Sequence, residues 1–227
     1  MRITNLEELD KSLCPFYDKT GCCNKEDLCN KTHRNAEINR CLIFHQMYPD
    51  PDLFINSLDD PSVVQLTDDD KQNLFNAFYI DIVSMLKQFG PLDDVVVASN
   101  KNDTLNGNVF AMFREVDAAS AAYLALNGQF YAGRKIRITF SPIIRLSSAV
   151  CRVNEDEACT QGNSCNFIHP YNPSNGIMDD CFPRINRKFA RAFRKSNKTS
   201  IRTTPIEALY GERREKNPTG PKIQGRY

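Results

Sequence analysis

The spacing of apolar residues predicts a long amphipathic helix in the middle of the chain. Apolar side chains recur every three to four positions from Asp68 to Gln88. Thr67 with Asp70 has the pattern of a capping box at its start, and Gly90-Pro91 ends it. The apolar stripe of the predicted helix consists of Leu74, Phe78, Ile82, Met85 and Phe89.

Short apolar runs bounded by turn residues predict four strands around this helix. Residues 49–66 are expected to form a loop. Asp117 is expected to cap a second helix, Ala118 to Leu126. The resulting order β-α-β-β-α-β predicts an α+β, ferredoxin-like domain over residues 38–145, the size and order of an RNA recognition motif, or RRM. The predicted strands are Cys41 to Tyr48, Val95 to Val97, Asn108 to Phe113 and Ile136 to Phe140.

Two arrays of cysteine and histidine with matching spacing flank this domain. Cys14, Cys23, Cys29 and His33 form a C-x8-C-x5-C-x3-H array, and a C-x7-C-x5-C-x3-H array follows the domain. Such arrays indicate Cys3His zinc fingers, because three thiolates and one imidazole complete the tetrahedral shell of structural zinc. The five-residue spacing selects Cys23 over the adjacent Cys22. The second ligand set is Cys151, Cys159, Cys165 and His169.

We therefore expect two zinc ions, one in a finger over residues 12–36 and one in a finger over residues 149–172. Each finger is too short to bury a core, so metal binding must supply much of its folding free energy. The first ten residues lack the apolar region of a secretory signal, which makes metal the expected role of the nine cysteines. No apolar run approaches the ~20 residues of a membrane span, so no membrane partner is expected.

The net charge of +1 conceals a separation of charge along the chain. Residues 1–181 carry 16 basic against 25 acidic side chains (−9), and residues 182–227 carry 13 against 3 (+10). The acidic part should repel a phosphate backbone and the basic part should attract one. Helical spacing of apolar residues predicts a basic helix, followed by a flexible tail, over residues 180–227. Its stripe is Phe182, Ile185, Phe189 and Phe193.

The predicted RRM lacks side chains that usually stack on RNA bases. The strongest RRM signature, K/R-G-F/Y-G/A-F-V-x-F/Y, aligns with Asn106 to Phe113. Asn108 takes the first aromatic position, and Ile43 stands at the stacking position of the first strand. We infer that this RRM binds protein and that the zinc fingers bind RNA.

The fingers carry the side chains that such a role needs. Phe16 and Tyr17 follow Cys14, and Phe167 lies between two ligands of the second finger. A base stacked on an aromatic ring gains ~1–3 kcal/mol, although these rings could instead only pack around the metal. Lys25, Lys31, Arg34 and Arg152 are the candidate phosphate contacts.

A finger, an RRM with degraded stacking residues and a second finger form a rare arrangement, which resembles the small subunits of the U2 snRNP auxiliary factor. The resemblance covers residues 14–169 well and the tail loosely. It is carried by Cys14-Pro15-Phe16-Tyr17, Gly107-Asn108-Val109-Phe110, Ser141-Pro142, Cys151-Arg152, Cys165-Asn166-Phe167-Ile168-His169 and Leu209-Tyr210-Gly211.

The resemblance implies a nuclear, non-enzymatic subunit for pre-mRNA splicing in the spliceosome. Its fingers would recognise the AG of the 3′ splice site in single-stranded pre-mRNA. In the first finger, Asn24 and Asn30 stand where the family usually has arginine and serine, which places Asn30 among the expected RNA contacts.

The resemblance also implies a heterodimer with the large subunit of the auxiliary factor. The RRM would be of the U2AF-homology type, which binds a tryptophan-bearing peptide between its first helix and an Arg-x-Phe loop. This assigns partner binding to Asp81, Gln129, Phe130 and Tyr131. Gln129 replaces the family's arginine, and Phe130 replaces its tryptophan.

Two other readings of the sequence stay open. The chain could be a protein-interaction scaffold whose zinc fingers are purely structural, or a Cys3His regulator of mRNA stability. An enzyme with a small-molecule substrate is not expected, because both ligand sets are closed. The remaining His45 has no nucleophile or carboxylate at a recognisable spacing.

Overall fold

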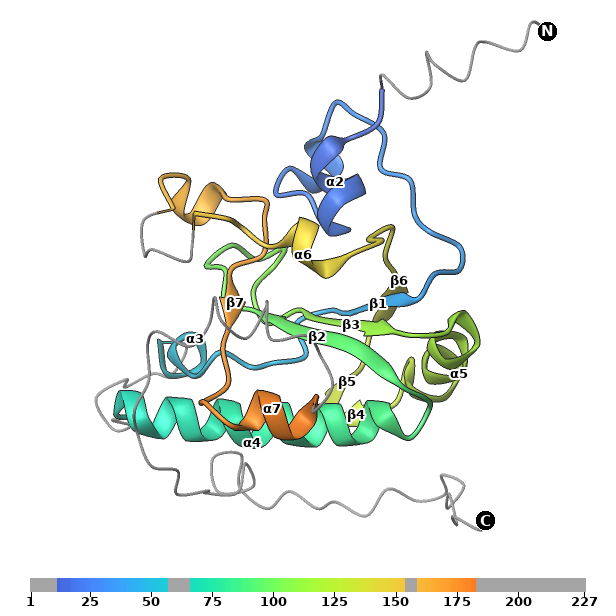
Figure 1. Cartoon of the computed structure of the whole chain (residues 1–227). Coiled ribbons are helices and arrows are strands. Elements are labelled where there is room, and N and C mark those ends of the chain that lie inside the picture. Colours follow the sequence, from blue (N-terminus) through green and yellow to red (C-terminus); the bar gives the residue numbers. More distant parts are fainter. Residues whose placement is uncertain (1–11, 57–65, 154–158, 183–227) are drawn as a thin grey trace, which may run out of the picture.

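The centre of the molecule is a five-stranded antiparallel sheet with the strand order β6-β1-β3-β2-β7 (Figure 1). The computed structural model describes residues 12–56, 66–153 and 159–182. Helices α4 and α5 follow β1 and β3 in the chain, so the predicted β-α-β-β-α-β order and ferredoxin-like fold are confirmed. The bounds are β1 Cys41–Phe44, α4 Asp68–Lys87, β2 Leu92–Ala98, β3 Val109–Phe113, α5 Val116–Leu126 and β6 Ile138–Phe140.

Helix α4 forms where the apolar stripe predicts it and ends one residue before Gln88. The Asp70 N–H donates to the Thr67 hydroxyl at 3.2 Å, and the Thr67 N–H donates to the Asp70 carboxylate at 3.0 Å. This closes the predicted capping box. The helix packs its apolar face against the sheet and so forms the first core. The buried apolar residues of α4 are Leu74, Phe75, Phe78, Tyr79, Ile82, Val83 and Leu86.

The segment after the first strand differs from the prediction. The strand was expected to reach Tyr48, but β1 ends at Phe44, and Gln46 has a positive φ of 49° that interrupts the extended backbone. Residues Pro51–Asn56 form the short helix α3 in place of part of the expected loop. Pro51 begins it, as suits a residue whose fixed φ is helical and whose missing N–H is not needed in a first turn.

The segment around α5 also differs. Glu115 is the N-cap residue in extended conformation, so Asp117, the expected cap, lies inside the first turn. A hairpin of β4 (Phe130–Tyr131) and β5 (Arg134–Lys135) follows the helix. The last strand, β6, therefore begins at Ile138 and not at Ile136 as predicted. Ala132 and Gly133 both have positive φ, which is the backbone of a tight two-residue hairpin turn.

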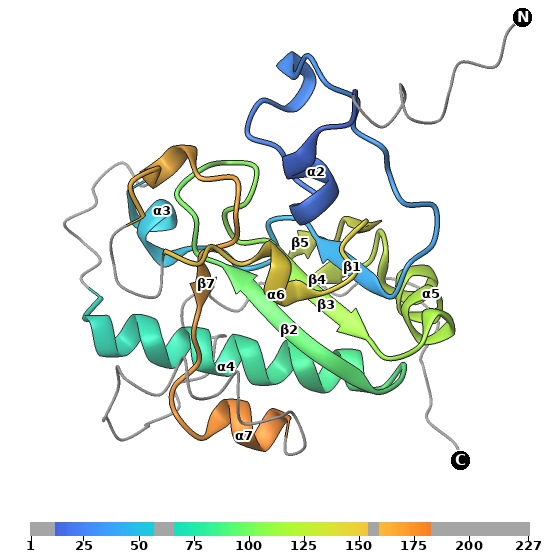
Figure 2. The ribbon, with the colours of Figure 1, turned by 45° about the horizontal axis from the view of Figure 1, so that its top comes forward.

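The face of the sheet opposite α4 is buried under the fingers. Figure 2 shows α2 (Pro15–Thr20) and α6 (Leu146–Ala149) on that side and α4 on the other. Phe110, at the centre of β3, has no exposed surface. The second core cluster, packed on this face, contains Cys22, Cys41, Ile43, Ala98, Leu105, Phe110, Met112, Ile143, Leu146, Ala149 and Ile168.

The first finger approaches the sheet through a glycine. Gly21 ends α2 with a φ of 68°, and a Cβ atom at this position would lie 2.5 Å from Cδ1 of Ile43 and 2.8 Å from Oγ of Ser141. Glycine satisfies both the left-handed backbone and the close contact. The finger can therefore lie directly on the strand that would otherwise present a base-stacking surface.

The second finger extends the sheet, which the sequence did not predict. Its last residues form β7 (Pro170–Tyr171), which pairs with β2, and α7 (Ile177–Cys181) then packs against α4. Helix α7 ends at Cys181. The basic helix and tail predicted over residues 180–227 fall almost wholly on residues 183–227, which lie outside the described residues. Within the described ranges, no helix is long and apolar enough to cross a membrane.

Candidate metal centres and nucleic-acid interface

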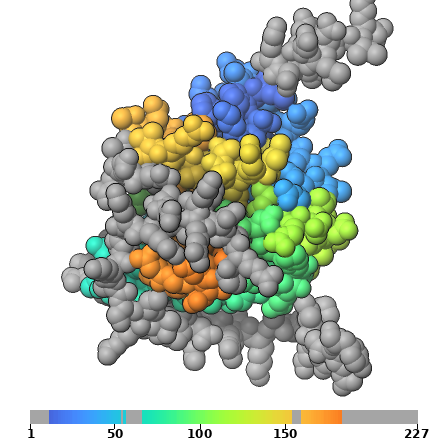
Figure 3. Space-filling model, in the orientation of Figure 1, coloured from blue at the N-terminus to red at the C-terminus, as the bar shows by residue number. Residues whose placement is uncertain are grey.

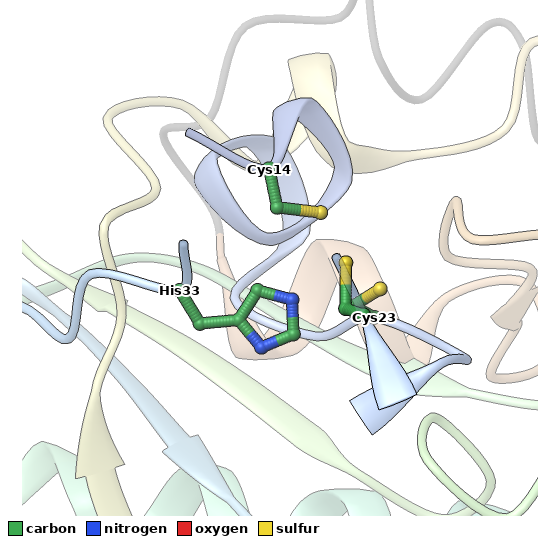
Figure 4. Close-up of side chains that lie close together, drawn as sticks. Cys14, Cys23 and His33 are labelled. Atoms are coloured by element: carbon green, nitrogen blue, oxygen red, sulfur yellow. The ribbon is translucent and has the colours of Figure 1, made fainter. Parts of the chain in front are cut away.

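The first finger brings its four predicted ligands to one point. Cys14 is the N-cap of α2, Cys23 follows the Gly21 turn, and Cys29 ends the short helix η1 (Glu26–Leu28). Their thiols and the His33 imidazole lie within 4.8 Å of one another. Figure 4 shows the Cys14, Cys23 and His33 side chains directed toward a common centre.

The second finger is built in the same way. Cys165 follows the short helix η4 (Gly162–Ser164), as Cys29 follows η1. The four ligand atoms of the second finger also lie within 4.8 Å of one another. In each finger the residue before the first cysteine forms a parallel bridge with the residue before the histidine. These bridges are Leu13 to Thr32 and Val150 to Ile168. The repeated spacing in the sequence thus corresponds to a repeated structure.

Both groups have the chemistry of a metal site. Nε2 of His33 and Nε2 of His169 are buried and have no hydrogen-bond partner. Buried polar atoms rarely lack a partner, and a metal ion within each ligand set would supply one. Cys22 stays outside the first set. Its Sγ accepts a contact from Nδ2 of Asn108 at 3.6 Å, and burial raises the pKa of its thiol to about 12, so it remains neutral.

The two fingers lie side by side, although more than 100 residues separate them in the chain. Figure 3 shows their atoms adjacent on one side of the molecule. The rings of Phe16 and Phe167 meet edge to face with centroids 6.3 Å apart, and Nζ of Lys19 lies 6.0 Å from the Phe167 centroid. Phe16 of the first finger and Phe167 of the second therefore form one surface.

The other RNA candidates belong to the same two fingers. Tyr17 stacks on the ligand His33 with centroids 4.5 Å apart and an angle of 7°, and its hydroxyl donates to Asn35. Phe16 is 40% exposed, whereas Phe167 and Tyr17 are half-buried. All polar candidates are exposed, namely Lys25, Asn30, Lys31, Arg34 and Arg152.

A loop of the RRM holds the second finger, a role that the sequence analysis missed. Asn100 is 1% exposed and uses both ends of its amide. Its Nδ2 donates to the Phe167 carbonyl at 2.9 Å, and its Oδ1 accepts from the His169 N–H at 2.8 Å. Nδ2 of Asn102 donates to the Cys165 carbonyl at 3.0 Å. The only available signal was the number of asparagines between the strands, which is typical of any turn.

The expected loss of base stacking on the RRM has a structural counterpart. Asn108 occupies an aromatic position of the RRM signature and is fully buried. Its Oδ1 accepts from the Gln46 N–H at 2.8 Å, and its Nδ2 donates to the Thr104 carbonyl at 2.8 Å. With Phe110 and Ile43 also covered, the described sheet surface offers no ring on which a base could stack.

The candidate partner residues gather where the β4–β5 hairpin meets α4. The Tyr131 hydroxyl donates to the Asp81 carboxylate at 2.7 Å, and its ring lies edge-on against Phe78 with centroids 6.0 Å apart. Phe130 points to the other side of the hairpin, because alternate residues of a strand face opposite ways, and it is 64% exposed. Gln129 is exposed, and its backbone pairs with Ile136.

Comparison with known proteins agrees with this geometry. The family described as RNA recognition motif matches residues 79–137. The chain is 36% identical over 187 residues to a U2af small-subunit splicing factor of Arabidopsis thaliana, a match that covers 82% of this chain and 66% of that relative. It is 30% identical over 173 residues to "Splicing factor U2AF 23 kDa subunit" of Schizosaccharomyces pombe, covering 76% of this chain and 77% of that relative.

The chain spans less than two thirds of the first Arabidopsis relative and 61% of a second U2af small-subunit splicing factor of the same plant, to which it is 35% identical. It spans more than two thirds of the fission yeast protein. The chain belongs to the family of U2AF small subunits.

Proposed function

We propose that this chain is a non-enzymatic RNA-binding subunit of the pre-mRNA splicing machinery, that it acts in the nucleus, and that its two fingers together recognise the AG of the 3′ splice site. One observation carries the proposal. The two fingers present a joint surface with the Phe16 and Phe167 rings, while the RRM face that usually binds RNA is buried. The names of the relatives support a role in splicing.

Each finger would hold one zinc ion through three thiolates and one imidazole. A zinc ion in such a closed shell supplies folding energy and no reactive position. The chain's own residues then do the recognition. The aromatic rings offer stacking surfaces for unpaired bases, each worth ~1–3 kcal/mol. The exposed cations of both fingers contact phosphates, and this part of the affinity falls as salt rises.

The proposal is tested by binding of the zinc-loaded protein to a short pyrimidine-AG RNA and to the same RNA with AG changed to CG. We expect the single base change to weaken binding by at least about tenfold, or ~1.4 kcal/mol. The measurement is a fluorescence anisotropy titration at two salt concentrations. Equal, weak and strongly salt-dependent binding to both RNAs would favour the scaffold with structural fingers instead. A preference for AU-rich RNA would favour a regulator of mRNA stability.

We further propose that the RRM binds a tryptophan-bearing peptide of the large subunit, beside α4 and the hairpin. Asp81 and Tyr131 already contact each other there, and Phe130 offers an exposed ring on the other side of the same hairpin. Aromatic side chains are common anchors of protein interfaces. The loss of the family's arginine at Gln129 removes one charged contact from this surface.

A Phe130→Ala variant should bind the large-subunit fragment at least about tenfold more weakly, because aromatic anchors dominate interface energies. Its stability should change little, since Phe130 is 64% exposed. Leu124→Ala is the matched control, because Leu124 is an 80% exposed apolar residue that belongs to α5 and not to the hairpin. Isothermal titration calorimetry would measure the affinity of both variants for the fragment. Unchanged affinity of Phe130→Ala for the fragment would show that the large subunit binds elsewhere on the chain.

A further inference from the structure

Two asparagines, each directly after a cysteine ligand, join the fingers. The Asn24 N–H donates to Oδ1 of Asn166 at 2.8 Å, and Nδ2 of Asn24 donates to the Ser164 carbonyl at 2.9 Å. Nδ2 of Asn166 lies 3.4 Å from the same carbonyl. These three residues, which we name the clamp, connect the loop after Cys23 to the loop before and after Cys165.

The clamp is not what holds either finger on the RRM. The second finger is held by Asn100 and Asn102 and by pairing of β7 with β2. The first finger is seated through Gly21 on the sheet and through Cys22 in the second core cluster. These contacts do not directly connect the metal-binding loop of one finger to that of the other. The clamp makes that connection.

Hydrogen bonds at this position suit orientation better than stability. Asn24 is exposed and Asn166 is half-buried, so water competes for both, and the net gain in unfolding free energy is small. The bonds are nevertheless directional, since they weaken steeply away from linear geometry. Two of them, one from the backbone and one from the side chain of Asn24, fix both the separation and the relative rotation of the loops.

The clamp lies next to the candidate base contacts. Asn166 precedes Phe167, whose ring meets Phe16 of the other finger, and Asn24 precedes Lys25. Rotation of one finger relative to the other would change the contact between Phe16 and Phe167. Stacking and base-edge contacts depend on the relative orientation of the fingers, whereas phosphate contacts by long cationic side chains tolerate a change in that orientation.

We propose that Asn24 and Asn166 are positioning residues for RNA selectivity, which hold the two fingers in the orientation in which one short RNA contacts both. The inference rests on the proposed reading of AG by the fingers. It assigns to Asn24 a contact between fingers rather than a contact with phosphate. Loss of the clamp should therefore reduce the discrimination between AG and CG more than the overall affinity.

The test compares Asn24→Ala, Asn166→Ala and the double variant in binding to the AG and CG RNAs. Each single variant should lower the AG-to-CG affinity ratio at least about threefold. Asn24→Ala removes the bond to the Ser164 carbonyl, and Asn166→Ala removes the bond to the Asn24 N–H. The double variant should lose less than the two single losses combined, because both bonds join the same two loops and the effects of neighbouring contacts are not additive. Zinc content and melting temperature should stay those of the wild type. Asn163→Ala is the matched control, since this exposed asparagine of the same finger contributes only its backbone carbonyl to a contact.

Residual dipolar couplings of the RNA-free protein give a second readout. Asn24→Ala should change the measured orientation of the first finger relative to the second, and Asn163→Ala should not. If the wild type prefers AG RNA over CG RNA and the clamp variants keep the same preference, the positioning role is contradicted. Additive losses would also contradict it, since each asparagine would then contact RNA on its own. A wild-type chain that binds AG and CG RNA equally would contradict the proposed function itself.

Discussion

A His169→Ala variant is expected to lose the metal of the second finger and on the order of 100-fold in affinity for AG RNA. His169 supplies the fourth ligand, and without it the loop that carries Phe167 loses its metal centre. Removing one stacking surface and its neighbouring cations costs a few kcal/mol, and each 1.4 kcal/mol is tenfold. Metal analysis and RNA titration of the purified variant would measure both losses.

The same variant should also destabilise the RRM, which the sequence alone did not suggest. From the sequence, loss of one finger should leave the RRM intact. In the structure, Ile168 belongs to the second core cluster, and the His169 N–H and carbonyl bond to Asn100 and Ser99. A lower melting temperature is therefore expected together with the metal loss. His45→Ala is the control, because His45 bonds only to Thr139 through its ring and should keep both metals. Full RNA affinity in His169→Ala would contradict the two-finger mechanism.

A Phe110→Ala variant should lose about 3–5 kcal/mol of unfolding free energy, the usual result of removing a buried phenylalanine. In an RRM that stacks RNA on its sheet, a ring at this position serves RNA binding. Here Phe110 is fully buried in the second core cluster, so its removal leaves a cavity under the fingers. Chemical denaturation followed by circular dichroism would measure the loss.

Phe16→Ala should behave in the opposite way. Phe16 is 40% exposed on α2, so its loss should change stability little and should weaken RNA binding by about tenfold, as expected for one stacked base. If Phe110→Ala instead kept its stability and lost RNA binding at a temperature where it is folded, the sheet would be the RNA-binding surface.

Local patterns predicted the elements that depend on local physics. The stripe from Leu74 to Phe89 and the capping box of Thr67 and Asp70 specify α4 by periodicity and by hydrogen bonds within one turn. The Cys3His spacing predicted both ligand groups, because a metal centre restricts which residues can meet around it. These features need no knowledge of the rest of the fold.

The missed features depend on contacts between distant segments. β7 has only two residues and forms because the second finger is held beside β2. Asn24 pairs with residues about 140 positions away, so its sequence neighbourhood carries no sign of the contact. In the sequence, Asn108 indicates only that an aromatic ring is missing from the RRM signature. The fold shows that its amide joins the first finger to the RRM loop.

The joint face of the two fingers, and not the RRM sheet, is expected to bind RNA. A titration of isotope-labelled, zinc-loaded protein with the short AG RNA, followed by NMR, tests it most directly. The largest chemical-shift changes are expected at Phe16, Tyr17 and Phe167, with small changes at Ile43 and Phe110. Large changes at the two sheet residues with the finger rings unaffected would contradict the account.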